Sequence, residues 1–430
     1  MKLILCSVVI TLPLLDNLHE FFAMTLLLIL FFSCWNTSEL KMLQNISSKL
    51  HPAASAFLKV IAKRSIQTCA HAVYKQAGLA VQFETDLPMP EIVQPTDAIV
   101  KVVKTTICGT DLHILNGNVS SCAPGRRLGH EGIGEIVEVG SDVVDRKVGD
   151  RVLMTTTTAC GKCHNCQNKF FGHCDDGGWI LGNRIDGLQG THTRVPHVDS
   201  SSYIIPEELW GTPQEDDIVM CSDILPTGLE VGLLDGDIKP GMSIAIVGAG
   251  PVGLAAQLCA SMFPPKDMFM IDMNEHRLQT SREIMETPGL EDTNYYSINN
   301  RDGSAVDQVM EVTKGKGVDL VVEAIGIPEG WYMSQDMVRA GGHIAMLGVH
   351  GKPATINLER MWYKNFKMSA GLVHGYSTPM LIERILNGKL PARKLISHRL
   401  PLSQMEKAYH MFTNAGKYET LKILIENDMA

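Results

Sequence analysis

The feature that most constrains this chain is a compact group of four cysteines, Cys160, Cys163, Cys166 and Cys174. The loop that carries them has too few apolar residues to order itself. In structural sites, zinc takes four ligands such as thiolates in a closed tetrahedral shell at about 2.3 Å. We therefore expect the four thiols to hold one structural zinc ion. The alternatives are a disulfide-bonded or an unordered loop.

A glycine-rich turn provides the second signal. Gly248-Ala-Gly250-Pro251-Val252-Gly253 follows an apolar run at 243–247 and opens a predicted helix at 252–262. In a dinucleotide-binding turn the first glycine permits the turn, the second admits a pyrophosphate, and the third lets helix and strand pack closely. The N–H groups and dipole at the helix start favour phosphate. The alternative is a glycine turn that binds no ligand.

An acidic residue lies where such a turn needs one. Asp272 ends the next predicted strand, at 268–272. A carboxylate there accepts hydrogen bonds from ribose hydroxyls and repels a 2′-phosphate. The sequence therefore predicts NAD as the cofactor.

The pattern of predicted secondary structure changes twice after the N-terminal extension. Short β-type runs at 98–104, 134–139 and 151–154 predict a mainly β unit. Alternating strands and helices follow, with further strands at 318–323 and 343–348, and predict a parallel sheet covered on both faces. The last part is mixed, with helices at 377–386 and 402–413 and a strand at 421–425. The predicted boundaries are 1–70, 71–226, 227–367 and 368–430, the last returning to the first domain.

Charge and the N-terminal segment limit the class of protein. The net charge of −9 leaves no basic footprint for nucleic acid and fits small-molecule partners.

Residues 42–70 are basic, bear several serines and lack Asp and Glu, as mitochondrial transit peptides do. We expect localisation in the mitochondrial matrix, with cytoplasm as the alternative. An unprocessed tail or a wrongly assigned upstream start codon would also account for the extension.

One motif links these signals to a known family. Gly129-His130-Glu131, followed by Gly134, Gly140 and Val143, is similar to the zinc signature of medium-chain alcohol dehydrogenases. The cysteine group and the glycine turn come in that family's order, and the resemblance covers residues 72–430. It implies an α/β protein with a GroES-like, mainly β catalytic domain and a Rossmann-type, doubly wound parallel sheet.

The resemblance also implies a second, catalytic zinc site. The family's zinc takes a Cys, a His and a third ligand ahead of a Thr-Gly pair, here Thr227-Gly228. Cys108 and His130 match the first two, and Asp223 occupies the third position, because Cys221 is two residues out of register. A carboxylate ligand resembles the secondary-alcohol branch of the family, and zinc accepts aspartate oxygen. The alternative for Asp223 is a helix N-cap.

Three further residues receive roles through the resemblance. Thr110 is similar to the family's hydroxyl relay, His113 would continue that relay, and Glu131 would bind zinc transiently or support its ligands. Their alternatives are a turn hydroxyl, an ordinary imidazole and a buried partner of a base.

Together these features imply an enzyme with two zinc ions per chain and NAD, active on a small primary or secondary alcohol and the corresponding aldehyde or ketone. The alternatives are a polyol or formaldehyde dehydrogenase of similar build, or a catalytically idle zinc and NAD binder. The resemblance also implies a homo-oligomer, either a dimer or a tetramer.

Overall fold

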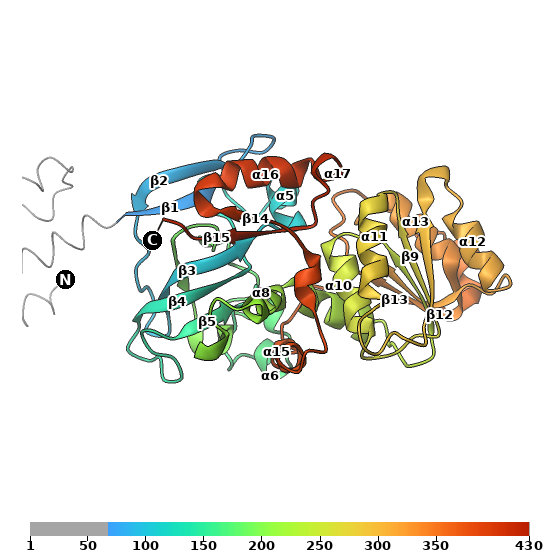
Figure 1. Cartoon of the computed structure of the whole chain (residues 1–430), viewed down its shortest axis with the longest axis horizontal. Helices are drawn as coiled ribbons and strands as arrows, with labels where there is room; N and C mark the ends of the chain where they lie inside the picture. Colours follow the sequence, from blue (N-terminus) through green and yellow to red (C-terminus); the bar gives the residue numbers. More distant parts are fainter. Residues whose placement is uncertain (1–67, 430) are drawn as a thin grey trace, which may run out of the picture. The chain divides into compact units, whose positions relative to one another are not determined.

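The computed structural model describes residues 68–429 (Figure 1). The residues before them include most of the predicted transit segment, which therefore lies outside the described part. Thr68, Cys69 and Ala70, assigned above to the extension, instead begin strand β1 (Thr68–Val73), because Cys69 and Ala70 are buried. β1 pairs with β2 (Gln82–Pro88) in a two-stranded sheet.

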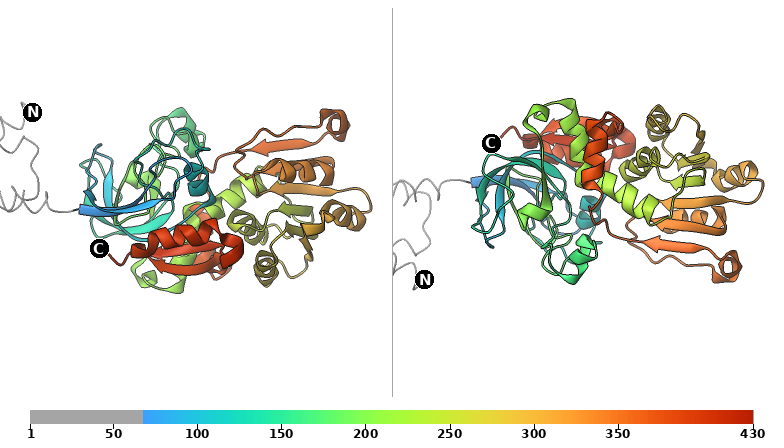
Figure 2. Two further views of the ribbon diagram at one scale, coloured as in Figure 1. Left: turned by 90° about the horizontal axis from the view of Figure 1, so that it is seen from above. Right: turned by 90° about the horizontal axis from the view of Figure 1, so that it is seen from below.

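Within residues 68–429 the first large sheet runs in the order β14-β15-β3-β4-β5-β7, with β6 paired to β3. Its strands are β3 (Ala98–Thr106), β4 (Gly132–Val139), β5 (Arg151–Met154), β6 (His192–Val195), β7 (Ser202–Ile204), β14 (Ile396–Pro401) and β15 (Lys422–Glu426). The end of the chain thus joins strands from its beginning, since Leu424 of β15 pairs antiparallel with Thr106 of β3. Figure 2 shows this red C-terminal segment beside the blue and teal strands.

The second large sheet is parallel throughout and has the order β10-β9-β8-β11-β12-β13 within the described residues. Its strands are β8 (Ser243–Val247), β9 (Asp267–Asp272), β10 (Asn294–Asn299), β11 (Val318–Glu323), β12 (Val338–Met346) and β13 (Lys367–Ala370). This sheet is the Rossmann-type sheet expected from the sequence.

Alternating side chains of this sheet pack against helices on opposite faces. Ile244 and Ile246 share a core with residues of α10 (Pro251–Ala260) and α11 (Glu275–Ile284). Ala245 and Val247 share another with residues of α12 (Ala305–Val312) and α13 (Pro328–Met337). Burial on both faces explains why these strands are continuous apolar runs rather than alternating ones.

The remaining helices are short and connect or cover the sheets. They are α5 (Gly109–Leu115), α6 (His164–Gln167), α7 (Val198–Ser201), α8 (Pro213–Val219), α9 (Ile224–Thr227), α14 (Leu358–Met361), α15 (Thr378–Leu386), α16 (Met405–Thr413) and α17 (Ala415–Tyr418). A π-helical segment, η4 (Gly228–Leu234), continues α9 toward β8.

Most predicted elements lie within a few residues of the observed ones, and two differ more. The strand expected at 343–348 begins earlier, at Val338, because a register shift extends its pairing with β11. The helix expected at 402–413 begins at Met405, after a 3-10 turn at Leu402–Gln404. The boundary predicted between residues 367 and 368 falls inside β13, which belongs to the parallel sheet.

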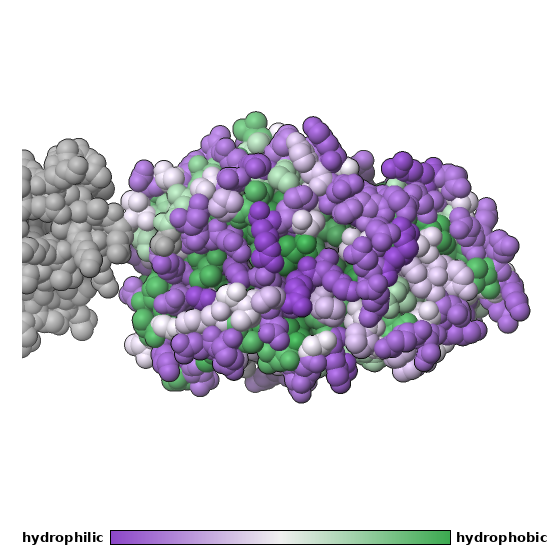
Figure 3. Space-filling model, viewed as in Figure 1, coloured by the Kyte–Doolittle hydropathy of each residue, from purple (hydrophilic) through white to green (hydrophobic). Residues whose placement is uncertain are grey.

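On the face drawn in Figure 3, hydrophobic residues lie among hydrophilic ones, as on ordinary protein surfaces. Among residues 68–429, every helix is too short or too polar to cross a lipid bilayer.

Candidate active site

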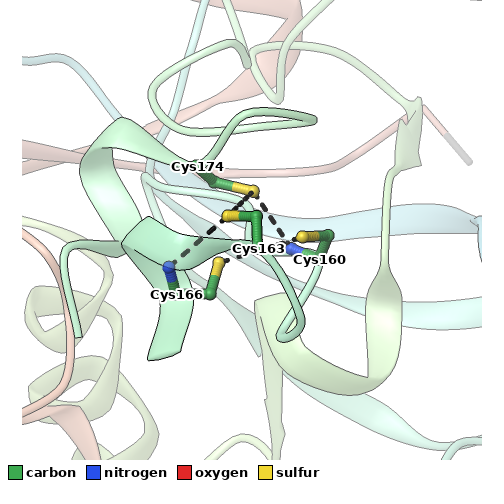
Figure 4. A group of neighbouring side chains, drawn as sticks. All are labelled: Cys160, Cys163, Cys166 and Cys174. Atoms are coloured by element: carbon green, nitrogen blue, oxygen red, sulfur yellow. Dashed lines mark hydrogen bonds between the residues drawn. The ribbon is translucent and has the colours of Figure 1, made fainter. Parts of the chain in front are cut away.

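The four predicted lobe cysteines converge in the structure (Figure 4). We call residues 159–175, which carry them, the zinc lobe. The sulfur atoms of Cys160 and Cys166 are 4.0 Å apart, and those of Cys163 and Cys174 are also 4.0 Å apart. Four thiolates at about 2.3 Å around one zinc ion would be about 3.8 Å apart, so this group fits a tetrahedral zinc site. His164 and His173 are exposed and are outside this group.

Backbone N–H groups of the zinc lobe donate hydrogen bonds that stabilise negative charge on the cysteine sulfur atoms. The N–H groups of Cys160 and Cys166 donate to the sulfur atoms of Cys174 and Cys163. The N–H groups of Asp175 and Cys166 lower the pKa of Cys163 to about 7. Burial raises the pKa of Cys166 and Cys174. Cys166 and Cys174 therefore favour the protonated thiol unless a cation is present, and zinc binding would release their protons.

A second group joins residues far apart in the chain. Cys108 is the residue before α5, His130 lies just before β4, and Asp223 lies just before α9. Asp223 Oδ2 is 3.5 Å from His130 Nε2 and 3.7 Å from Cys108 Sγ. Among residues 68–429, these three side chains and Glu131 form one of two groups with metal-ligand geometry.

These separations match a single zinc ion. Tetrahedral ligands at about 2.0–2.3 Å from zinc have N···O and S···O distances of about 3.4–3.6 Å. The donor set of one thiolate, one imidazole and one carboxylate is also one that zinc accepts, and it leaves a fourth position for another ligand. The residues present therefore fit a catalytic zinc ion.

The geometry also bears on the alternatives for Asp223. Asp223 does occupy the N-cap position of α9, but its side chain caps no backbone N–H group. Its Oδ1 accepts a hydrogen bond from Thr227 Oγ1 at 2.9 Å, which leaves Oδ2 facing His130 and Cys108. Cys221 is fully buried in the main apolar core and lies outside the ligand group.

The site is electrostatically coupled. Burial opposes a charged imidazole, but the carboxylates of Asp111 and Asp223 raise the pKa of His130 above its usual value. Burial also opposes the ionised form of Asp223, yet hydrogen bonding and attraction to His130 lower the pKa of Asp223 to about 2. Without a metal ion the two side chains thus form an ion pair, and a bound cation would replace the proton on the imidazole.

Three neighbours of the ligand group were missed from the sequence. Asp111 Oδ1 lies 3.6 Å from His130 Nδ1, on the ring edge opposite Asp223. Lys422, on β15, forms a buried ion pair with Glu131. Trp179 stands edge-on to His130, with ring centres 6.2 Å apart. Asp111 lies in the Cys108-Gly-Thr-Asp-Leu-His113 segment, but nothing in that segment shows that its carboxylate faces His130. Trp179 and Lys422 belong to no motif, and only the return of the C-terminal segment would have pointed to Lys422.

Glu131 retains one free oxygen. Its Oε2 contacts Lys422 Nζ and Thr106 Oγ1, whereas its Oε1 is buried with no hydrogen-bond partner among the described residues. This arrangement is compatible with both predicted roles, as a partner of a base and as a supporting group for the zinc site.

A pocket of about 350 Å³ connects the ligand group with the glycine turn. Cys108, His130 and Asp223 line one part of it, and Gly250, Pro251 and Val252 line another. Thr110 and His113 line it as well, and Thr110 Oγ1 is 3.7 Å from Cys108 Sγ. Burial lowers the pKa of His113, which favours its neutral form.

The glycines of the turn have distinct steric roles. Gly248 has a φ of +106°, which disfavours other residues. A Cβ on Gly253 would lie 1.9 Å from Gly248 O, whereas one on Gly250 would meet nothing closer than Arg277 at 3.9 Å. Gly253 is thus required for the packing of helix on strand, and Gly250 keeps the approach from the pocket open, as the motif predicts.

Asp272 supports the turn directly. Its Oδ2 accepts a hydrogen bond from the N–H of Ala249 at 2.7 Å, and its Oδ1 accepts one from the N–H of Asn274 at 2.8 Å. Arg277 Nη1 lies 4.0 Å from Oδ2. The carboxylate therefore braces the turn and places a negative charge beside it.

Comparisons with known proteins show the family to which this chain belongs. The family profile described as "Alcohol dehydrogenase GroES-like domain" matches residues 94–206, and "Zinc-binding dehydrogenase" matches 251–386. An alcohol dehydrogenase of Cupriavidus necator is 31% identical over 369 residues, covering 79% of this chain and 94% of the relative. An L-threonine 3-dehydrogenase of Pyrococcus horikoshii is 30% identical over 342 residues, covering 78% of this chain and 92% of the relative.

A solved structure, zinc dependent alcohol dehydrogenase 2 from Streptococcus pneumonia in its apo form, matches with a TM-score of 0.77. It is 40% identical and covers 84% of this chain and 99% of that chain. The fold and the site define a zinc-type dehydrogenase with a nucleotide-binding domain. The chain belongs to the zinc-dependent medium-chain alcohol dehydrogenase family and is an oxidoreductase.

Proposed function

We propose that this enzyme transfers hydride between NAD and a small primary or secondary alcohol, using one catalytic and one structural zinc ion per chain. The observation that carries the proposal is the convergence of Cys108, His130 and Asp223 on a pocket that also contains Gly250 of the dinucleotide turn. A site for polarising oxygen and a site for a hydride acceptor thus share one cavity.

The chain's own residues supply binding, orientation and proton transfer. Zinc, when bound, contributes Lewis acidity toward an alcohol hydroxyl or a carbonyl oxygen. The cofactor contributes the hydride chemistry. Cys108, His130 and Asp223 hold the metal, and the N–H groups at the start of α10 together with Gly250 receive the pyrophosphate.

The proton of the alcohol needs a route out of the pocket. Thr110 Oγ1 lies beside Cys108 and lines the pocket, so its hydroxyl accepts the proton from the substrate and passes its own outward. His113, held neutral by burial, is the next acceptor in this proposal. Asn118 Nδ2 donates to its Nδ1 at 3.4 Å, so a proton arriving at Nδ1 would replace that hydrogen bond.

The size and lining of the pocket favour a small substrate. Its volume of about 350 Å³ lies at the low end of the usual range for ligand sites and must also admit part of the cofactor. Trp179, Leu372 and Phe412 are among its apolar lining residues. These side chains exclude water and leave space for a short alcohol.

Replacement of the third ligand tests the proposal. Asp223→Ala should lose the catalytic zinc and turnover while keeping the lobe zinc and the fold. Cys221→Ala is the matched control, because Cys221 is two residues away but faces the core. Zinc content and a panel of short primary, secondary and polyhydric alcohols, formaldehyde and L-threonine, each with NAD or NADP, would be measured. Retained turnover in Asp223→Ala would refute this ligand assignment.

We also propose that the enzyme is a homo-oligomer that associates through the β13 edge of the parallel sheet. β13 ends the strand order, and exposed Leu358, Trp362, Tyr363 and Met368 lie on or just before it. Open sheet edges and exposed apolar clusters favour association. Light scattering should give a dimer or tetramer, and Trp362→Glu should shift it toward monomer; a monomeric wild type would refute this.

For localisation, we propose import into the mitochondrial matrix, supported by the basic, acid-free composition of residues 42–70. Sequencing of the mature N-terminus tests it: a start before residue 40 would refute processing.

A further inference from the structure

We propose that Gln189 is a positioning residue for the catalytic zinc site, linking Tyr409 of the C-terminal helix α16 to Asp111, the carboxylate that faces His130. The inference builds on the zinc site of the proposed function. It concerns how this chain holds a ligand in place rather than which residues are ligands.

Gln189 is completely buried and makes three hydrogen bonds. Its Nε2 donates to Asp111 Oδ2 at 2.8 Å and to the carbonyl oxygen of Thr106 at 3.0 Å. Its Oε1 accepts from Tyr409 Oη at 2.6 Å. Because the carbonyl of Thr106 can only accept, the amide nitrogen must face it, and the amide oxygen must then receive the tyrosine proton. The donor and the acceptor of each of these three hydrogen bonds are therefore fixed.

Asp111 depends on this amide. Its Oδ2 accepts from the N–H of Cys108 at 2.9 Å and from Gln189, while Oδ1 points to His130 Nδ1 at 3.6 Å. Neither of these two atoms has a hydrogen-bond partner among the described residues, so the electrostatic contact between them is the polar contact that Oδ1 makes. With Gln189 absent, a carboxylate that is buried to 99% would keep one donor at Oδ2 and would be free to turn away from His130.

The orientation of His130 depends in turn on Asp111. Its Nε2 faces Asp223 and Cys108, so the ring can ligate a metal through Nε2 only if Nδ1 carries the proton. An acceptor at Nδ1 fixes this tautomer and the ring plane, and loss of such a partner typically weakens metal binding about 10–100-fold. Gln189 acts on the ligand through this carboxylate.

The same network ties the site to the end of the chain. Tyr409 lies on α16, which packs beside β15, and β15 carries Lys422 to Glu131 (Figure 1). The C-terminal segment therefore supports both sides of the ligand group, through Gln189 toward His130 and through Lys422 toward Glu131.

The test compares Gln189→Leu with Gln257→Leu. Gln257 is also completely buried and also bonds through both amide atoms, to the carbonyl and hydroxyl oxygens of Ser281, but it lies in α10 outside the ligand group. Both variants lose a buried amide. The rate at which a chelator removes each zinc ion would be measured, along with the visible spectrum of the Co²⁺-substituted catalytic site and the thermal midpoint.

We expect Gln189→Leu to lose the catalytic metal about 10–100-fold faster than wild type and to show an altered Co²⁺ spectrum. The rate of zinc loss from the lobe should stay at the wild-type value. Gln257→Leu should lose stability but keep wild-type metal kinetics. If Gln189→Leu does not fold, Tyr409→Phe decides: removal of one hydroxyl should speed metal loss about fivefold.

Two outcomes overturn the inference. Wild-type metal kinetics and spectrum in folded Gln189→Leu, or in Tyr409→Phe if that variant decides, would show that the network is structural only. Equal acceleration in Gln257→Leu would show the same. A wild-type protein that binds only the lobe zinc would instead refute the proposed function, and this inference with it.

Discussion

The buried ion pair between Lys422 and Glu131 allows a quantitative test of how the C-terminal segment supports the site. Lys422 is 1% exposed and Glu131 is 2% exposed. Lys422 Nζ also donates to Thr106 Oγ1 at 3.2 Å and to the carbonyl of Ile107 at 3.3 Å. Lys422→Met removes the charge but keeps much of the volume, so it leaves the Glu131 carboxylate buried without its cation.

Removal of one partner of a buried pair costs about 3–5 kcal/mol, whereas replacing both partners costs much less. Since a domain is stable by only about 5–15 kcal/mol, Lys422→Met should lose a large share of its unfolding free energy at pH 8. The double variant Glu131→Gln with Lys422→Met should recover at least about 2 kcal/mol of that loss.

The same variant should respond to pH. Burial raises the pKa of Glu131 even with Lys422 present, and loss of the lysine removes the opposing influence. A carboxyl with a raised folded-state pKa is favoured when protonated, so the penalty should shrink as pH falls from 8 to 5.5. Guanidinium chloride unfolding at both values, at equal zinc loading, measures it. A single variant within about 1 kcal/mol of wild type at pH 8, or a double variant no more stable than the single, would refute the reasoning.

Three further predictions follow from the turn and the lobe. Gly253→Ala should destabilise the enzyme by at least about 2 kcal/mol, because its Cβ would lie 1.9 Å from Gly248 O, whereas Gly250→Ala should keep the thermal midpoint and weaken NAD binding measured by calorimetry. Equal thermal effects of the two would contradict the steric argument. Asp272→Gly should shift the kcat/KM preference toward NADP, because it removes a negative charge and frees Arg277, 4.0 Å away; a wild type that already prefers NADP would count against it. Zinc affinity of the lobe, measured by competition with a chromophoric chelator, should fall as pH falls, since burial raises the pKa of Cys166 and Cys174 and binding must displace their protons. A pH-independent affinity between pH 6 and 8 would show that these thiols are already ionised.

The sequence predicted the fold best where the pattern is local. The apolar runs at 243–247 and 318–323 match β8 and β11. A strand that is buried on both faces needs apolar side chains at nearly every position, so it leaves a continuous apolar run in the sequence. The turn glycines were assigned from spacing, and the structure gives each a steric reason. The start of β12 was missed because its first residues pair through a register shift that no local pattern encodes.

The candidate site shows the limit of such reasoning. Cys108, His130 and Asp223 were proposed through motifs, and the structure brings them together. Gln189 and Lys422 were missed because they contact the site only after the sheet forms and the C-terminal segment returns to it. Partners separated by many residues leave no periodicity, so tertiary structure alone reveals them.

In the proposed function, Cys108, His130 and Asp223 share one zinc ion beside the dinucleotide turn. An anomalous difference map, measured at the zinc absorption edge on crystals of the zinc-loaded enzyme, tests it most directly. We expect two peaks per chain, one within the four lobe cysteines and one about 2.0–2.3 Å from Cys108 Sγ, His130 Nε2 and Asp223 Oδ2. A single peak in the lobe, or a second peak without Asp223 as a ligand at that distance, would contradict it.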